Sequence, residues 1–314
     1  MNIIKERNAS AFLLLNAILW GSSYIWSKML LGYLPYFTIL FVFSLGGLLS
    51  LSIIFFKRIM NINRKTVIIG MSIGCFWILS NIFCMLALKG TSSSNTAFIV
   101  QLSVIITPLL MSMYRKKLPG GRVVFSAITA LAGLLLLTCD FKSLSFQSGD
   151  LFALCNAVFF SLYLVALKIY SGKTDPVQFT FVQHVAGTVV FLFMALFFEM
   201  RQVAVSSVDI TGYAILILSI AISVSTILIQ SSAIKYVKPE KATVIYTLEP
   251  VTAAVLAYIL SGEKPADLSA IAGCILILFA VAGSVYRIHG AQKLKNKVEY
   301  TYLQPVAAIR RKGA

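Results

Sequence analysis

Apolar segments follow one another along almost the whole chain, and short polar stretches separate them. Each segment has about 20 residues, the length at which a helix crosses the hydrocarbon core of a bilayer. The connections are too short to hold an inserted soluble domain. The pattern predicts an all-α membrane protein with ten transmembrane helices, at about residues 9–31, 36–56, 66–88, 94–114, 122–140, 150–171, 177–198, 211–234, 239–261 and 266–287.

The composition excludes a soluble domain. Hydrophobic residues make up 59% of the chain and charged residues 12%, which is too little charge to cover a globular surface in water. The first apolar segment is too long for a signal peptide and has no small-residue cleavage site, so we expect it to be retained. The five cysteines show no CxxC or Cys/His metal spacing and are expected to pack as small apolar side chains.

The net charge of +16 is distributed unevenly along the chain. If the N-terminus is placed inside, most of the 27 Lys and Arg residues fall on that same side, which is the pattern of cytoplasmic loops. The five that fall outside are Lys28, Lys89, Lys142, Arg201 and Lys264. Both termini are therefore predicted to be cytoplasmic. The basic tail, 288–314, is expected either to bind anionic lipid or to remain solvated, and it resembles no nucleic-acid module.

The two halves of the chain repeat each other at an offset of 140 residues. Matched positions are Phe12 with Phe152, Asn16 with Asn156, Ala17 with Ala157 and Lys28 with Lys168. Each half, 1–142 and 149–287, contains five predicted helices. Because five is odd, the second half enters the membrane from the opposite side, and such inverted repeats place a substrate site between them. We therefore expect two inverted five-helix repeats around a central cavity.

Four stretches of this chain resemble the EamA-type branch of the drug/metabolite transporter superfamily. They are WGSSYIWSK (20–28), SSSNTAFIVQLSVIITPLL (92–110), GDLFALCNAVFFSLY (149–163) and YVKPEKATVIYTLEPVTAAVLAYILSGE (236–263). The resemblance covers about residues 9–287. It implies a metabolite carrier, with efflux favoured over uptake, in a bacterial inner membrane. The first half has Thr107-Pro108 where the second has Glu249-Pro250, so an acidic role at this position is carried once.

Glu249 is the sharpest candidate for function because it lies midway along the ninth predicted helix. A charge at that depth costs a few kcal/mol unless it is neutralised, paired or facing water. A low dielectric favours the neutral carboxyl, which can ionise when water or a cation reaches it. That behaviour suits a proton-coupled carrier. A structural alternative is a hydrogen-bonded Glu that braces the helix beside Pro250.

Further polar and aromatic residues lie within the predicted helices and are candidates for lining a substrate cavity. Asn16, Trp20 and Tyr24 recur every four residues on one helix stripe, and Trp77 and Asn81 form a similar pair. The other candidates are Gln101, Tyr163, Gln230 and Tyr246. Each is also compatible with an ordinary hydrogen bond between helices. His184, in the seventh predicted helix, is interpreted as a neutral side chain that forms a hydrogen bond across helices, in preference to a proton relay.

These residues indicate the chemistry of the substrate. No row of Lys or Arg lies at membrane depth, which disfavours a polyanionic ligand, whereas aromatic and amide groups suit a small amphipathic metabolite such as an amino acid or an aromatic compound. The chain contains no P-loop, so we do not expect ATP to drive transport directly. We expect a secondary transporter that either uses inward proton flow or lets its substrate diffuse down its own gradient.

Other classes of function are less well supported. The chain has no catalytic set such as HExxH, so an enzyme, a metal site and a cofactor are not predicted. A non-transporting membrane assembly or sensor protein is the alternative. The sequence leaves monomer and homodimer open.

Overall fold

The structure is a computed structural model that describes residues 8–90, 96, 99–138, 148–200, 208–261 and 268–286. The regular structure of these residues is helical. The helices are α1 (Ala9–Leu30), α2 (Tyr36–Ile54), α3 (Phe56–Ile59), α4 (Arg64–Gly90), α6 (Ser103–Arg115), α7 (Gly121–Thr138), α8 (Ser148–Tyr170), α9 (Pro176–Glu199), α10 (Ile210–Ala233), α11 (Pro239–Tyr246), α12 (Leu248–Ser261) and α13 (Leu268–Tyr286).

Most helices follow the apolar segments closely. In the described part of the chain, six of them are long and apolar enough to cross a membrane, namely α1, α2, α4, α8, α9 and α10. Helices α7 and α13 contain shorter apolar segments. The protein is therefore a multi-pass membrane protein. The predicted basic tail lies outside the described residues. So do most of the residues from 94 to 98, with which the predicted fourth helix begins.

The ninth predicted helix is not continuous, because it is divided at Thr247 into α11 and α12. Pro250 has no N–H group, so the carbonyl of Tyr246, four residues earlier, loses its helical donor. That carbonyl accepts a hydrogen bond from Gln101 Nε2 at 3.5 Å instead. The predicted helix is thus two shorter helices, and the proline accounts for the break.

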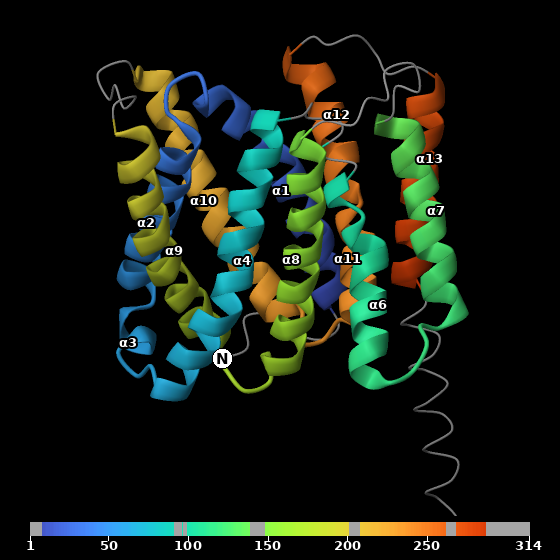
Figure 1. Cartoon of the computed structure of the whole chain (residues 1–314), viewed down its shortest axis with the longest axis horizontal. Coiled ribbons are helices and arrows are strands. Elements are labelled where there is room, and N and C mark those ends of the chain that lie inside the picture. Colours follow the sequence, from blue (N-terminus) through green and yellow to red (C-terminus); the bar gives the residue numbers. More distant parts are fainter. Residues whose placement is uncertain are drawn as a thin grey trace, which may run out of the picture.

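The helices run side by side as long rods, with α2 and α9 at one edge of the bundle and α7 and α13 at the other (Figure 1). The main packing pairs are α4 with α8, α7 with α13, α2 with α9, α1 with α10, α1 with α12, α4 with α9, α6 with α8, and α6 with α11. The core between them contains Tyr163 and Tyr246, the largest fully buried side chains in the described part of the chain. The core therefore buries polar-tipped aromatic residues as well as aliphatic ones.

Helix α1 approaches α12 unusually closely at Gly21. A Cβ atom at this position would lie 2.5 Å from the Glu249 carbonyl oxygen and 2.6 Å from the Cβ atom of Thr252. Only glycine permits this separation, as in the small-residue contacts of other membrane helices. The contact fixes the start of α12 against the middle of α1.

Polar contacts join α2 and α9 at both of their ends. At one end the buried Glu199 carboxylate accepts hydrogen bonds from the backbone N–H groups of Phe37 and Thr38, at 2.9 and 2.7 Å, and from the Thr38 hydroxyl at 2.9 Å. At the other end Arg58 of α3, the short helix directly after α2, forms an ion pair with Asp175, which also caps the N-terminus of α9. The two helices are thereby held as a pair.

A second set of polar contacts gathers where α6 ends and α11 begins. Arg115 donates a hydrogen bond to Glu240 at 2.7 Å, which joins α6 to α11. Lys241 Nζ lies 3.1 Å from the Ser10 hydroxyl at the start of α1. Lys168 Nζ donates to the carbonyl groups after α10. This end of the bundle is closed by cationic side chains that reach between helices.

Candidate functional site

Glu249 lies at the break between α11 and α12, in the first turn of α12. Its side chain is buried, and its Oε2 atom accepts a hydrogen bond of 3.4 Å from Gln101 Nε2. The same amide nitrogen reaches the Tyr246 carbonyl. Gln101 therefore spans the break and contacts the acidic group and the free carbonyl together.

Three aromatic rings from three helices meet beside this break. The ring centroids of Trp20 on α1 and Tyr246 on α11 are 5.2 Å apart, and Phe160 on α8 lies 5.8 Å from Trp20 and 6.1 Å from Tyr246. Such tilted pairs are favourable arrangements of aromatic side chains. Tyr163 extends the group, with its centroid 6.4 Å from that of Phe160. We call Trp20, Phe160, Tyr163 and Tyr246 the aromatic cluster.

Amide side chains border the aromatic cluster. Gln230 Nε2 on α10 donates to the Tyr246 hydroxyl at 3.2 Å. The fully buried Asn16 amide lies beside Tyr246, and the Tyr163 hydroxyl lies beside Gln183 and Ser231, but neither forms a hydrogen bond of normal geometry, and the Gln230 Oε1 atom likewise has no partner within the described part of the chain. A buried polar group without a partner costs about 1–3 kcal/mol. The site is therefore rich in donors and acceptors that a polar ligand can satisfy.

The structure brings most of the predicted cavity residues together, but not all of them. Asn16, Trp20, Gln101, Tyr163, Gln230, Tyr246 and Glu249 gather around the break. Trp77 shares the same continuous core, yet its ring packs on His184 and Phe191 of α9, at 6.1 and 6.0 Å. Asn81 donates to the Trp77 carbonyl of its own helix at 2.8 Å. The side chain of Tyr24 lies outside the described residues.

Phe160 is a member of the aromatic cluster that the sequence analysis did not single out. It is an apolar residue in an apolar helix, so its type alone gives no signal. Its spacing of three residues from Tyr163 places both on one helix face and is the available clue. Asn156, the repeat partner of Asn16, has a different role. Its amide donates to the Ser80 carbonyl at 2.6 Å and joins α8 to α4.

His184 is fully buried on α9 and lies against α2. It is not in contact with the aromatic cluster. A Cβ atom at Gly47 of α2 would come within 2.4 Å of its imidazole ring, and Trp77 packs on the other side. Its ring lies beside the Ser44 backbone of α2, without a hydrogen bond of normal geometry to the described residues. The ring fills the contact between α2, α4 and α9.

A helical bundle with several membrane-spanning helices and a buried polar and aromatic centre defines a multi-pass membrane protein with an internal site. The chain belongs to the EamA-like transporter family, whose model matches residues 8–139 and 147–286. This confirms the resemblance seen in the sequence. The protein is therefore a membrane transporter, and a transporter of this kind binds a small-molecule substrate within the bilayer.

Individual relatives agree with this assignment. The chain is 26% identical over 299 residues to a Bacillus subtilis (strain 168) protein named uncharacterized transporter YyaM. The matched region covers 91% of this chain and 96% of the relative. It is 27% identical over 287 residues to an uncharacterized transporter of Archaeoglobus fulgidus, which covers 88% of this chain and 86% of the relative. A protein crystal structure matches with a TM-score of 0.71 and 16% identity, over 88% of this chain and 96% of that chain, and so shares the fold.

Proposed function

We propose that the protein is a secondary transporter that exports a small amphipathic metabolite, such as an amino acid or an aromatic compound. The observation that carries this proposal is the aromatic cluster beside buried amides whose hydrogen-bonding groups are unused. An aromatic surface accommodates the apolar part of a ligand, and amides orient its polar part. Cationic side chains of the described region lie at helix ends, which disfavours a polyanion.

The proposed mechanism is alternating access between two inverted five-helix repeats, 1–142 and 149–287. At the offset of 140 residues, α1 corresponds to α8, α4 to α10, α2 to α9 and α7 to α13. A twofold axis would turn the pair α1–α10 into α8–α4 and would turn α2–α9 and α7–α13 into themselves. All of these pairs pack together. The packing thus supports an inverted repeat, the architecture in which carriers expose one central site to alternate sides.

The location follows from the same proposal. We place the protein in a bacterial inner membrane. Both termini are placed in the cytoplasm, because most basic residues fall in the connections on the same side as the N-terminus.

Glu249 is the proposed coupling residue for protons. Its carboxyl group is buried beside a helix break, and Gln101 can donate to its ionised form. We expect Glu249→Gln to abolish pH-driven transport while the protein still folds, since Gln keeps the size and a hydrogen-bonding oxygen. Uptake by proteoliposomes measured across a series of pH gradients checks this. Unchanged transport with unchanged pH dependence in this variant would exclude coupling at Glu249.

A proteoliposome screen tests the proposed function itself. Purified protein is reconstituted into liposomes that are loaded with labelled amino acids or aromatic metabolites. Release of the labelled compound is followed with and without a pH gradient. We expect release of at least one compound, competition by its close analogues, and a large loss in Trp20→Ala with a smaller loss in Trp20→Phe. The matched control is Phe83→Ala, because Phe83 stacks on Phe159 and Phe152 away from the aromatic cluster.

The alternative of a non-transporting assembly or sensor protein predicts a different result. In that case no candidate compound would be released, although the protein would bind a partner.

A further inference from the structure

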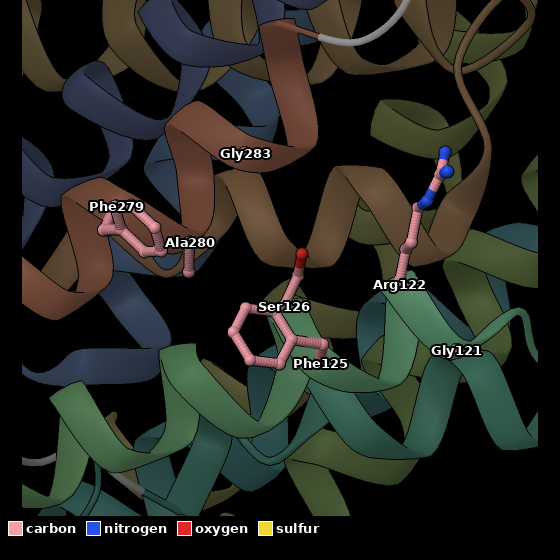
Figure 2. Close-up of a pocket in the computed structure, with 7 residues that line it drawn as sticks. All are labelled: Gly121, Arg122, Phe125, Ser126, Phe279, Ala280 and Gly283. Carbon is pink, nitrogen blue, oxygen red and sulfur yellow. The ribbon is translucent and has the colours of Figure 1, made fainter.

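A groove of about 300 Å³ separates α7 from α13 at one end of the bundle. Figure 2 shows Phe125 and Ser126 on α7 facing Phe279 and Ala280 on α13, with Arg122 at one end of the gap. Two glycines, Gly121 and Gly283, complete the lining. The groove is mainly apolar and has one cationic side chain at its mouth.

Small residues explain why α7 and α13 diverge toward this groove. At Gly133 the helices touch, since a Cβ atom there would lie 2.7 Å from the Gly273 carbonyl oxygen and 2.8 Å from Ile277. At Gly121 and Gly283 a Cβ atom would meet nothing within 4 Å. The two helices therefore cross closely in their middle and splay apart at the end where α7 begins and α13 finishes.

The groove opens on the outer surface of the bundle. Helices α7 and α13 form one edge of the molecule in Figure 1, and Phe125 and Phe279 are each 63% exposed there. Ile128, Ile275 and Leu278 extend the same exposed apolar surface. In a bilayer this surface faces acyl chains, so lipid has direct access to the groove.

The mouth of the groove carries positive charge. Arg122 lies in the first turn of α7, and the connection before it contains the exposed Lys116 and Lys117 without any acidic residue. Arg115 in the same stretch is already paired with Glu240. Basic pockets between membrane helices at the cytoplasmic side bind anionic lipid headgroups, and the predicted orientation places this end in the cytoplasm.

We propose that the groove binds one acyl chain of an anionic phospholipid, whose phosphate is held by Arg122. The chain packs between Phe125 and Phe279, and the Ser126 hydroxyl, which points into the gap, donates to an ester carbonyl. Guanidinium groups recognise phosphate oxygens through paired hydrogen bonds. The proposal concerns the edge of the molecule and is independent of the substrate at the aromatic cluster.

Native mass spectrometry of the full-length protein can measure this binding. The protein is titrated with phosphatidylglycerol and, separately, with phosphatidylcholine that carries the same acyl chains. We expect tighter binding of phosphatidylglycerol. We expect Arg122→Gln to weaken it about fivefold, which corresponds to about 1 kcal/mol for one basic residue at an anionic lipid. Binding of phosphatidylcholine should not change in this variant.

Two further variants separate the groove from the general surface charge. Gly283→Leu fills the open space beside Gly283 and should weaken the binding of both lipids. Arg64→Gln removes an exposed arginine from the first turn of α4, at the same end of the bundle, and should leave binding unchanged.

Three outcomes would overturn the proposal. An equal loss of phosphatidylglycerol binding in Arg64→Gln and Arg122→Gln would show that only the general surface charge matters. Undiminished binding in Gly283→Leu would place the lipid elsewhere. A dimer that Gly283→Leu abolishes, without any effect on lipid, would make the groove a contact with a second copy of the chain.

Discussion

Gln101 contacts two groups that the ninth helix leaves without partners of its own. One is the Tyr246 carbonyl, whose helical donor is missing because of Pro250, and the other is the Glu249 carboxyl group. An unsatisfied carbonyl or carboxyl in an apolar surrounding is costly. A single amide side chain thus stabilises a broken helix and an acidic residue at once.

We therefore expect Gln101→Leu to destabilise the protein. Leucine has a similar volume but no donor, so the loss should be about 0.6–2 kcal/mol, between the average membrane hydrogen bond and the cost of an orphaned buried group. Thermal unfolding of the detergent-solubilised protein checks this as a lowered midpoint. Thr129→Val is the control, because the Thr129 hydroxyl donates within its own helix to Phe125. Equal midpoints for Gln101→Leu and the unmodified protein would contradict this role.

At the scale of single residues, the sequence predicts which side chains matter better than it predicts their contacts. Glu249, Trp20 and Tyr246 stand out because an acidic group, a tryptophan and a polar-tipped aromatic ring are each uncommon within the apolar segments. The bond from Gln101 to Glu249 joins residues 148 apart in sequence, so it depends on how two helices are placed. Phe160 gives no signal of its own, since it is an apolar residue in an apolar segment.

Helices α2 and α9 are joined by polar contacts near both of their ends. Glu199, the last residue of α9, caps the start of α2, while Asp175 caps the start of α9 and pairs with Arg58 beyond α2. A helix N-terminus leaves N–H groups without partners, and a carboxylate satisfies them with a favourable charge. Pairing at both ends favours movement of α2 and α9 as one unit.

The cap at Glu199 should be an important stabilising contact. Glu199→Ala removes three hydrogen bonds at a buried position, and we expect it to lower the free energy of unfolding by about 1–3 kcal/mol. Asp209→Ala is the comparison, because Asp209 is exposed and caps α10 through the N–H group of Gly212, with the Tyr33 side chain as a further partner. The midpoint of thermal unfolding should fall further for Glu199→Ala. A larger fall for Asp209→Ala would refute the argument.

The positions of the helices follow from the sequence because the bilayer imposes them. Each span has to be apolar and about 20 residues long, so its ends are marked by the first polar residues. The apolar pattern does not predict the break at Thr247, although Pro250 is visible in the sequence. Membrane helices often keep a proline without breaking, since neighbouring side chains satisfy the free carbonyl, and only tertiary structure shows which outcome holds.

For the whole molecule, the proposed inverted repeat makes a prediction about sidedness. Starting from a cytoplasmic N-terminus, the connection between α6 and α7 should be cytoplasmic, and the start of α10 should be on the other face. Lys117 and Asp209 are exposed at these two places. In a cysteine-free background, Asp209→Cys should react with an impermeant maleimide in intact cells, whereas Lys117→Cys should react only after permeabilisation. Labelling of both from one side would contradict the proposed topology.

The interruption at Thr247 leaves the segment 239–261 with a joint between two arms, which both pack on α1 but carry different further contacts. Arg115 anchors the lower arm, α11, to α6, while the upper arm, α12, rests against α1 at Gly21. Under the proposed alternating access, bending at this joint would widen one mouth of the protein while the opposite mouth stays shut. Under the proposed proton coupling, a change in the charge of Glu249 would act directly at this joint.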